Sequence, residues 1–210
     1  AKKLENLIAP LETSFETGKV TYIDFPAETQ IYNSCENSGI FGEQKISISQ
    51  KTFGKFSKPS PPISSHNNYI FSNSIEEGKR FYIFVKPFEY PFKISTLVFM
   101  TSKNYCFKNS PSFISNEISQ LNSENLKIQN CLTGDIKVCF GTGTSGSECD
   151  VVVEGTCTAY YCENEFEQGY VTKKGDKIAY TGSLLYGAIF SDKETYECQV
   201  KRLMKRFEQI

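Results

Sequence analysis

Hydrophobic and polar residues alternate along much of this chain, which is the pattern of β-strands with one buried face. In the segment QKISISQ, Ile46 and Ile48 would lie on one face of a strand and the polar residues on the other. Similar alternation, or short runs of β-branched and aromatic residues, recurs throughout the sequence. The pattern predicts strands at 20–25, 45–49, 69–73, 80–87, 92–101, 135–140, 149–161, 169–172, 177–181 and 184–190.

The C-terminal segment has a helical pattern instead. Ser191 and Glu194 have the spacing of a capping box, so a helix is predicted over 191–210. Its apolar residues fall on one stripe, which we expect to pack on the β-rich body. These residues are Tyr196, Val200, Leu203, Phe207 and Ile210. Shorter helical turns are predicted at 1–10 and at 114–121.

Two polar segments interrupt the strand pattern and suggest how the chain is organised. The segment 51–68 has three prolines and a polar end, so it is predicted to be a long exposed loop. The Asn/Ser-rich segment 106–130 is predicted to connect a β-sandwich-like half, 1–105, to a Cys-rich β half, 131–210. We therefore expect a mainly β fold, with disulfide-stapled antiparallel sandwich-like sheets and a C-terminal amphipathic helix.

The charge balance excludes one class of partner. With 23 basic and 24 acidic residues the formal net charge is -1, so no overall positive field would attract nucleic acid. Hydrophobic residues make up 39% of the chain and charged residues 22%, which is the composition of a folded protein. The longest apolar runs are far shorter than the roughly 20 residues that span a bilayer.

Eight cysteines, an even number, indicate a disulfide framework and therefore an oxidising compartment, either extracellular or in the secretory pathway. From Cys131 to Cys162 the cysteines are separated by seven, nine, seven and four residues, which is not the spacing of a zinc site. Cys35 and Cys106 precede this cluster and are predicted to pair with each other. The disulfide candidates are Cys35, Cys106, Cys131, Cys139, Cys149, Cys157, Cys162 and Cys198.

The glycine-rich run from Gly141 to Gly146 matches GxGxxG, the pattern of dinucleotide-binding loops. Such a loop must lead into a helix, whose first amides bind the pyrophosphate. Here the following residues, SECDVVV, have strand character. We therefore expect a wide hairpin turn stapled by the flanking cysteines, and no cofactor.

Two groups of residues are candidates for catalysis. His66, the only histidine, follows Ser64 and Ser65 in the proline-rich segment and is interpreted as a solvated surface side chain. Glu163, Glu165 and Glu167 would be spaced by about 6.6 Å if CENEFEQ were extended. They could serve a hydrolase or hold calcium, or they could form an acidic face that discourages edge-to-edge strand pairing, which is the favoured interpretation.

The C-terminal helix provides the candidate contact surface. Its cations Lys201, Arg202, Lys205 and Arg206 complement the helix dipole, or attract anionic lipids or a partner helix. Cys198 and Lys205 would lie opposite the apolar stripe, so Cys198 is predicted to bond a loop that wraps the outer side of the helix. The candidates for partner or membrane contact are Tyr196, Val200, Leu203, Phe207, Lys201, Arg202, Lys205 and Arg206.

The leading hypothesis is a secreted or cell-surface binding or structural protein without catalytic activity, either self-contained or part of a larger assembly. We expect a protein partner or self-association and no nucleic acid, and the C-terminal helix is the candidate for membrane contact. The alternative is a secreted hydrolase that uses the three glutamates Glu163, Glu165 and Glu167.

Overall fold

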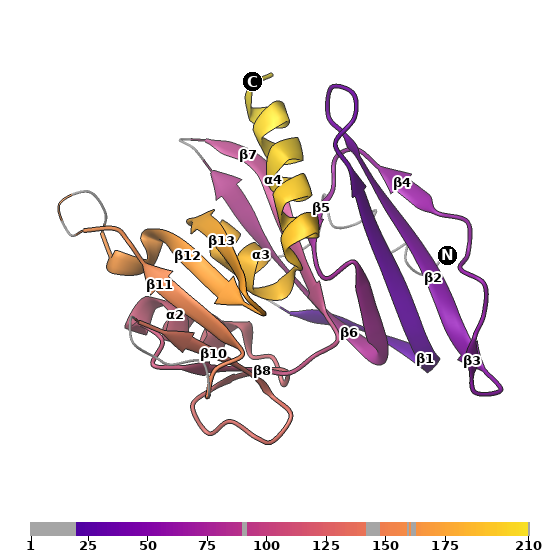
Figure 1. Ribbon diagram of the computed structural model, residues 1–210, viewed down its shortest axis with the longest axis horizontal. Coiled ribbons are helices and arrows are strands. Elements are labelled where there is room, and N and C mark those ends of the chain that lie inside the picture. Colours follow the sequence, from indigo (N-terminus) through magenta and orange to yellow (C-terminus); the bar gives the residue numbers. More distant parts are fainter. Residues whose placement is uncertain (1–19, 90–91, 142–147, 159, 161–162, 210) are drawn as a thin grey trace. The chain divides into compact units, whose positions relative to one another are not determined.

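The computed structural model describes residues 20–89, 92–141, 148–158, 160 and 163–209. The chain divides into two compact units, which are described separately below (Figure 1). Unit 1 contains the described residues up to Ser102 together with the C-terminal segment from Phe190, and unit 2 is Lys103–Ile189. The helix expected at 1–10 lies outside the described residues. The prediction of a mainly β chain that ends in a helix is confirmed.

Unit 1 is built on a seven-stranded sheet in the order β3-β2-β1-β6-β7-β5, with β4 also paired to β2. The sheet is mixed, since β5 runs parallel to β7 while the other pairs are antiparallel. The prediction of purely antiparallel sheets is therefore wrong. The elements are β1 (Thr21–Glu36), β2 (Glu43–Thr52), β3 (Lys55–Phe56), β4 (Ile63–Ser65), β5 (Tyr69–Phe71), β6 (Ile75–Glu89), β7 (Lys93–Thr101) and helix α4 (Lys193–Phe207).

The proline-rich segment 51–68 is exposed over most of its length, as the sequence predicts, but it is not one continuous loop. It forms β3 and β4, and both strands pair with β2. Between them Ser60 exchanges two hydrogen bonds with Ile48: the Ser60 amide donates to the Ile48 carbonyl, and the Ile48 amide donates to Oγ of Ser60. Polar residues thus provide hydrogen-bond partners for the backbone groups at the edge of β2. A pattern of hydrophobic positions could not predict this pairing.

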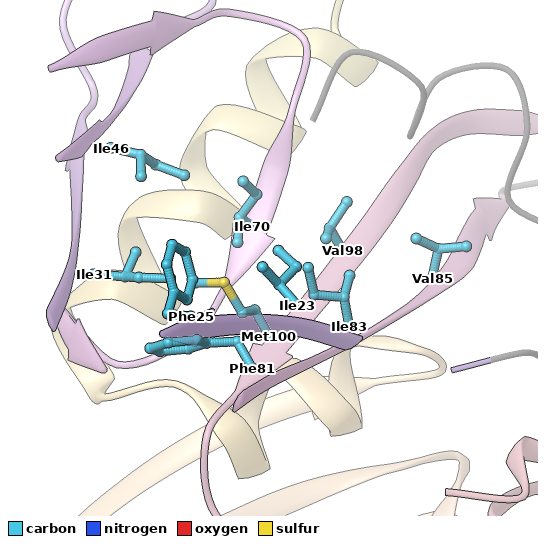
Figure 2. Close-up of a cluster of buried hydrophobic side chains, with 10 residues drawn as sticks. All are labelled: Ile23, Phe25, Ile31, Ile46, Ile70, Phe81, Ile83, Val85, Val98 and Met100. Atoms are coloured by element: carbon cyan, nitrogen blue, oxygen red, sulfur yellow. The ribbon is translucent and has the colours of Figure 1, made fainter. Parts of the chain in front are cut away.

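The core of unit 1 draws side chains from five strands, and Figure 2 shows them converging on one cluster. Side chains of β1 and β2 also join β5 to the rest of the sheet. The side-chain amide of Gln44 acts like a strand backbone, accepting from the Ile70 amide (3.0 Å) and donating to the Ile70 carbonyl (3.3 Å). The buried Asn33 side chain donates to the same carbonyl. The cluster contains Ile23, Phe25, Ile31, Ile46, Ile70, Phe81, Ile83, Val85, Val98 and Met100.

Unit 2 has a six-stranded sheet in the order β13-β12-β11-β10-β8-β9, with antiparallel pairing only at β11-β12 and β12-β13. The segment 106–130, expected as a connector, forms most of β8, all of α2 and β9. The helical turns expected at 114–121 are confirmed, with Ile114, Ile118 and Leu121 buried. The elements are β8 (Tyr105–Lys108), α2 (Ser112–Leu121), β9 (Leu126–Ile128), β10 (Ile136–Phe140), β11 (Val151–Gly155), η2 (Glu165–Glu167), β12 (Gln168–Lys173), β13 (Asp176–Thr181) and α3 (Leu184–Phe190).

Two expected elements of unit 2 have a different form. Residues 184–190 form helix α3 and not a strand, and all seven are buried. A short run that is apolar on every side has no periodicity to distinguish a buried strand from a buried helix. The chain between β10 and β11 does not make a hairpin, because these strands pair in parallel. The expected hairpin at 173–176 is confirmed, since Lys173 pairs with Asp176.

Three disulfides are described, and each lies within one unit: Cys35–Cys198 in unit 1, and Cys106–Cys131 and Cys139–Cys149 in unit 2. The predicted Cys35–Cys106 pair is therefore wrong, because Cys35 bonds Cys198 and Cys106 bonds Cys131. Cys139–Cys149 is the staple expected around the glycine-rich run, most of which lies outside the described residues. Cys157 is also disulfide-bonded, and Cys162 lies outside the described residues.

Candidate functional site: a cationic cleft in unit 1

Helix α4 begins one residue later than the capping box predicts. Its N-cap is Asp192, whose side chain accepts a hydrogen bond from the Thr195 amide at 2.8 Å. The buried residues of the helix are Thr195, Tyr196, Gln199, Arg202 and Leu203. At 100° per residue this buried face is rotated by about 60° from the predicted apolar stripe and is centred on Gln199.

This rotation changes which residues face the sheet. Tyr196 and Leu203 are buried as predicted, but Val200 is only partly buried and Phe207 is 36% exposed. Arg202, which the sequence offered as a surface cation, is 0% exposed. Tyr196, Arg202 and Leu203 therefore belong to the interior of unit 1 and do not provide a surface for a partner or a membrane. Ile210 lies outside the described residues.

Arg202 is held in unit 1 entirely by carbonyl oxygens. Its guanidinium lies 5.1 Å from the centre of the Tyr69 ring. Burial lowers the pKa of Arg202, an effect that Tyr69 and Glu43 oppose. The hydrogen bonds run from Nε to Phe41 O, from Nη1 to Asn68 O and Gln199 Oε1, and from Nη2 to Ser65 O and His66 O. One side chain thus fixes the β1–β2 and β4–β5 loops against α4.

Gly42 allows the β1–β2 loop to approach Arg202 this closely. A Cβ atom at this position would lie 2.7 Å from Cγ of Arg202 and 2.6 Å from the Glu36 carbonyl oxygen. Its φ of 61° is also one that side-chain-bearing residues rarely adopt. Lys205 secures the same loop, because its Nζ donates to the Asn37 and Gly39 carbonyls.

One turn beyond Arg202, Arg206 lines an open cleft of about 310 Å³ between the β4–β5 loop, the start of β7 and the end of α4. Lys93 is the second cation of the cleft. The described residues that line the cleft include no Asp or Glu. The remaining polar lining comes from Asn67, Asn68, Ser95 and Thr96.

The positions of the cationic side chains follow from the fixed loop. Asn67 lies between two residues, His66 and Asn68, whose carbonyls bind Arg202. Nη1 of Arg206 donates to Oδ1 of Asn67 at 3.1 Å, which directs the guanidinium towards the cleft. The buried Arg202 therefore orients the partly buried Arg206 through the hydrogen-bonded β4–β5 loop.

A buried hydroxyl lies beside this cleft. Tyr69 is 0% exposed, and its hydroxyl makes no hydrogen bond of standard geometry with any described residue. Burial raises the pKa of Tyr69, while Arg206 and Arg202 act in the opposite direction. Arg206 thus lowers the pKa of the hydroxyl both through its charge and through a contact that falls short of standard hydrogen-bond geometry.

The other predicted site residues are not brought together. The exposed His66 side chain places Nδ1 2.9 Å from the Gly42 carbonyl oxygen, and Lys201 is exposed on α4. Glu165 and Glu167 lie in the 3-10 turn η2 and not on an extended strand, so the condition behind the spacing of about 6.6 Å is not met. Glu167 instead accepts a hydrogen bond from the Glu163 amide at 3.1 Å. Within the described part of the chain, no group of three acidic, His or Cys residues could hold a metal ion.

Cys198 also differs from its prediction, since its partner Cys35 is a residue of β1 and not of a wrapping loop. The sequence singled out Arg206 but missed Lys93, Asn67, Ser95 and Thr96. The only available signal was the four-residue spacing of Arg202 and Arg206, which puts both on one helix face.

Comparison with known proteins adds no relative. No protein-family model, no curated protein and no solved structure matches this chain. None of the helices in the described ranges is long and apolar enough to cross a membrane. The fold and the site together define a two-unit, disulfide-bonded, mainly β protein with a cationic cleft in unit 1.

Proposed function

We propose that this is a non-catalytic binding protein of an oxidising compartment, and that unit 1 binds an anionic group in the cleft. The observation that carries the proposal is that Arg206 and Lys93 line one cleft, and that the described lining of this cleft has no carboxylate. Two like charges in one concavity repel each other, and an anion relieves that repulsion.

The chemistry of the lining favours a small oxyanion. A guanidinium presents parallel N–H donors that match the oxygens of a carboxylate, sulfate or phosphate ester, and a lysine adds a point charge. Asn67, Ser95 and Thr96 can donate further hydrogen bonds to an attached polar group. A volume of about 310 Å³ is at the lower end of the range for small-molecule sites. We therefore propose an acidic sugar or a carboxylate-bearing small molecule as the ligand class.

The compartment is inferred from the disulfides. Three described disulfides within the units are typical of secreted and secretory-pathway proteins and rare in reducing compartments. Extracellular and secretory-lumen acidic ligands include sulfated and carboxylated glycans, which agrees with the proposed ligand class.

The test is a titration with sodium sulfate and with citrate at constant ionic strength, monitored by amide resonances in NMR spectra. We expect saturable shifts of Asn67, Asn68, Ser95 and Thr96, which Arg206→Gln and Lys93→Gln each weaken at least about tenfold. Lys201→Gln, an exposed cation on the same helix, is the matched control and should bind as the wild type does. Equal weakening by Lys201→Gln, or no saturable shifts in the wild type, would refute the cleft as an anion site.

A further inference from the structure

The turn between β2 and β3 places an aromatic residue, Phe53, in a backbone conformation that bulky side chains rarely adopt and in full contact with solvent. Thr52 pairs with Lys55, so Phe53 and Gly54 form a two-residue hairpin turn in which φ is 50° at Phe53 and 79° at Gly54. Positive φ at both positions is the geometry that selects Asn-Gly or Asp-Gly, and a bulky aromatic residue is a rare occupant. The chain thus accepts backbone strain to place Phe53 at this position.

Phe53 is also the most exposed large hydrophobic residue among the described residues of the chain, at 107% relative exposure. The comparable turn in unit 2 has the same pair of positive φ angles, but a polar residue, Lys174, precedes its glycine, Gly175. A strained, fully exposed aromatic residue on a hairpin tip contributes nothing to folding. Strain of this kind is retained where function requires it.

The charges around the tip are all of one sign along the chain. No Asp or Glu occurs in residues 44–75, whereas the segment contains Lys45, Lys51, Lys55 and Lys58. Lys45 and Lys51 are neutralised by two glutamates of β1, through Lys45–Glu36 and Lys51–Glu28 ion pairs. Lys55 and Lys58 are exposed and contact no carboxylate of the described residues.

From these observations we infer that the β2–β3 hairpin is a docking tip for an anionic lipid surface, with Phe53 inserted at the level of the headgroups. Aromatic side chains gain free energy by leaving water at such an interface, and lysines near them are attracted to acidic headgroups. The hairpin lies at the outer edge of the sheet, where β3 ends the strand order (Figure 1). Phe53 is fully exposed there without any rearrangement of unit 1. The surface is separate from the cleft and does not depend on the ligand proposed for it.

The test measures co-sedimentation of the full-length protein with 100 nm vesicles of 30% phosphatidylserine and 70% phosphatidylcholine, and with vesicles of phosphatidylcholine alone. We expect binding to the acidic vesicles that Phe53→Asn weakens by at least about tenfold. Asn suits a position of positive φ, so this variant should unfold at a higher denaturant concentration than the wild type. Loss of binding then cannot be attributed to a failure to fold.

Further variants separate charge from insertion. Lys55→Gln and Lys58→Gln should each weaken binding to acidic vesicles about fivefold, and raising the salt concentration should weaken the wild type in the same way. Phe113→Ala, which removes an exposed aromatic residue of unit 2, is the control and should bind normally. Undiminished binding by Phe53→Asn, or equal binding of the wild type to both kinds of vesicle, would overturn the inference. A lack of any vesicle binding would also overturn it, and would indicate that Phe53 inserts into a pocket of a partner protein.

Discussion

The guanidinium carbon of Arg202 lies 5.1 Å from the centre of the Tyr69 ring, and both side chains are fully buried. A buried cation is costly unless its lost hydration is replaced. Here five carbonyl oxygens and an aromatic face replace it, and no carboxylate of the described residues forms an ion pair with it. Helix α4 and the loops that supply those oxygens therefore stabilise one another.

Replacing Arg202 should destabilise unit 1 strongly. In Arg202→Met four backbone carbonyls lose a buried donor, and we expect the free energy of unfolding to fall by about 3–5 kcal/mol. Urea unfolding followed by tyrosine fluorescence measures this. Lys201→Met, at the exposed neighbouring position, should change stability by less than about 0.5 kcal/mol. An Arg202→Met variant as stable as the wild type would show that the carbonyls find other donors.

Removing only the hydroxyl of Tyr69 should have the opposite effect. Because this buried group has no hydrogen-bond partner among the described residues, Tyr69→Phe should be neutral or up to about 1 kcal/mol more stable. The ring beneath Arg202 is retained in this variant. Urea unfolding again gives the measurement, and a loss of more than about 1 kcal/mol would mean that the hydroxyl is bonded, with Arg206 as the nearest donor.

The rotated face of α4 can be tested by comparing two of its apolar residues. Leu203 is 0% exposed, so Leu203→Ala should destabilise the protein by about 2–5 kcal/mol. Phe207 is 36% exposed, and Phe207→Ala should cause less than half of that loss although the side chain is larger. Thermal unfolding ranks the two variants, and the reverse order would restore the stripe that the sequence predicts.

Asp192 should make stability depend on pH. Burial raises its pKa, but hydrogen bonds from Ser74 and Thr195 outweigh this and lower the pKa below the ordinary value of 3.8. A lowered carboxyl pKa contributes stability above the unfolded value and loses it as the pH falls through the folded value. Asp192→Ala should therefore cost about 1–2 kcal/mol at pH 7, and the difference from the wild type should shrink below about pH 4. A pH-independent difference would contradict the charged cap.

The disulfide between Cys35 and Cys198 closes a sequence separation of 163 residues, whereas Cys139 and Cys149 are separated by only 10. In the chain-entropy description, replacing both members of the first pair by Ala should cost about 3–5 kcal/mol and replacing both of the second about 2–3 kcal/mol. A peptide map of the unreduced protein should show Cys35 linked to Cys198. A Cys35–Cys106 peptide would contradict the assignment.

The local pattern of the sequence was enough to locate most strands and the C-terminal helix. Alternation marks a strand because one face meets the core, and a 3.6-residue period marks a helix for the same reason. The pattern failed at 184–190, where every side chain is buried, and at 51–68, where polar groups satisfy the edge of β2.

Only the tertiary structure decided which cysteines pair, which face of α4 is buried and where the cationic cleft lies. Cys35 bonds Cys198, and Lys93 and Arg206 line the same cleft, although more than 100 residues of chain separate the members of each pair, a proximity that no local period encodes. Arg202 is the clearest case. Its charge suggests the surface, but the carbonyl groups that make its burial possible come from loops that are distant in sequence, so their combined effect exists only in the folded chain.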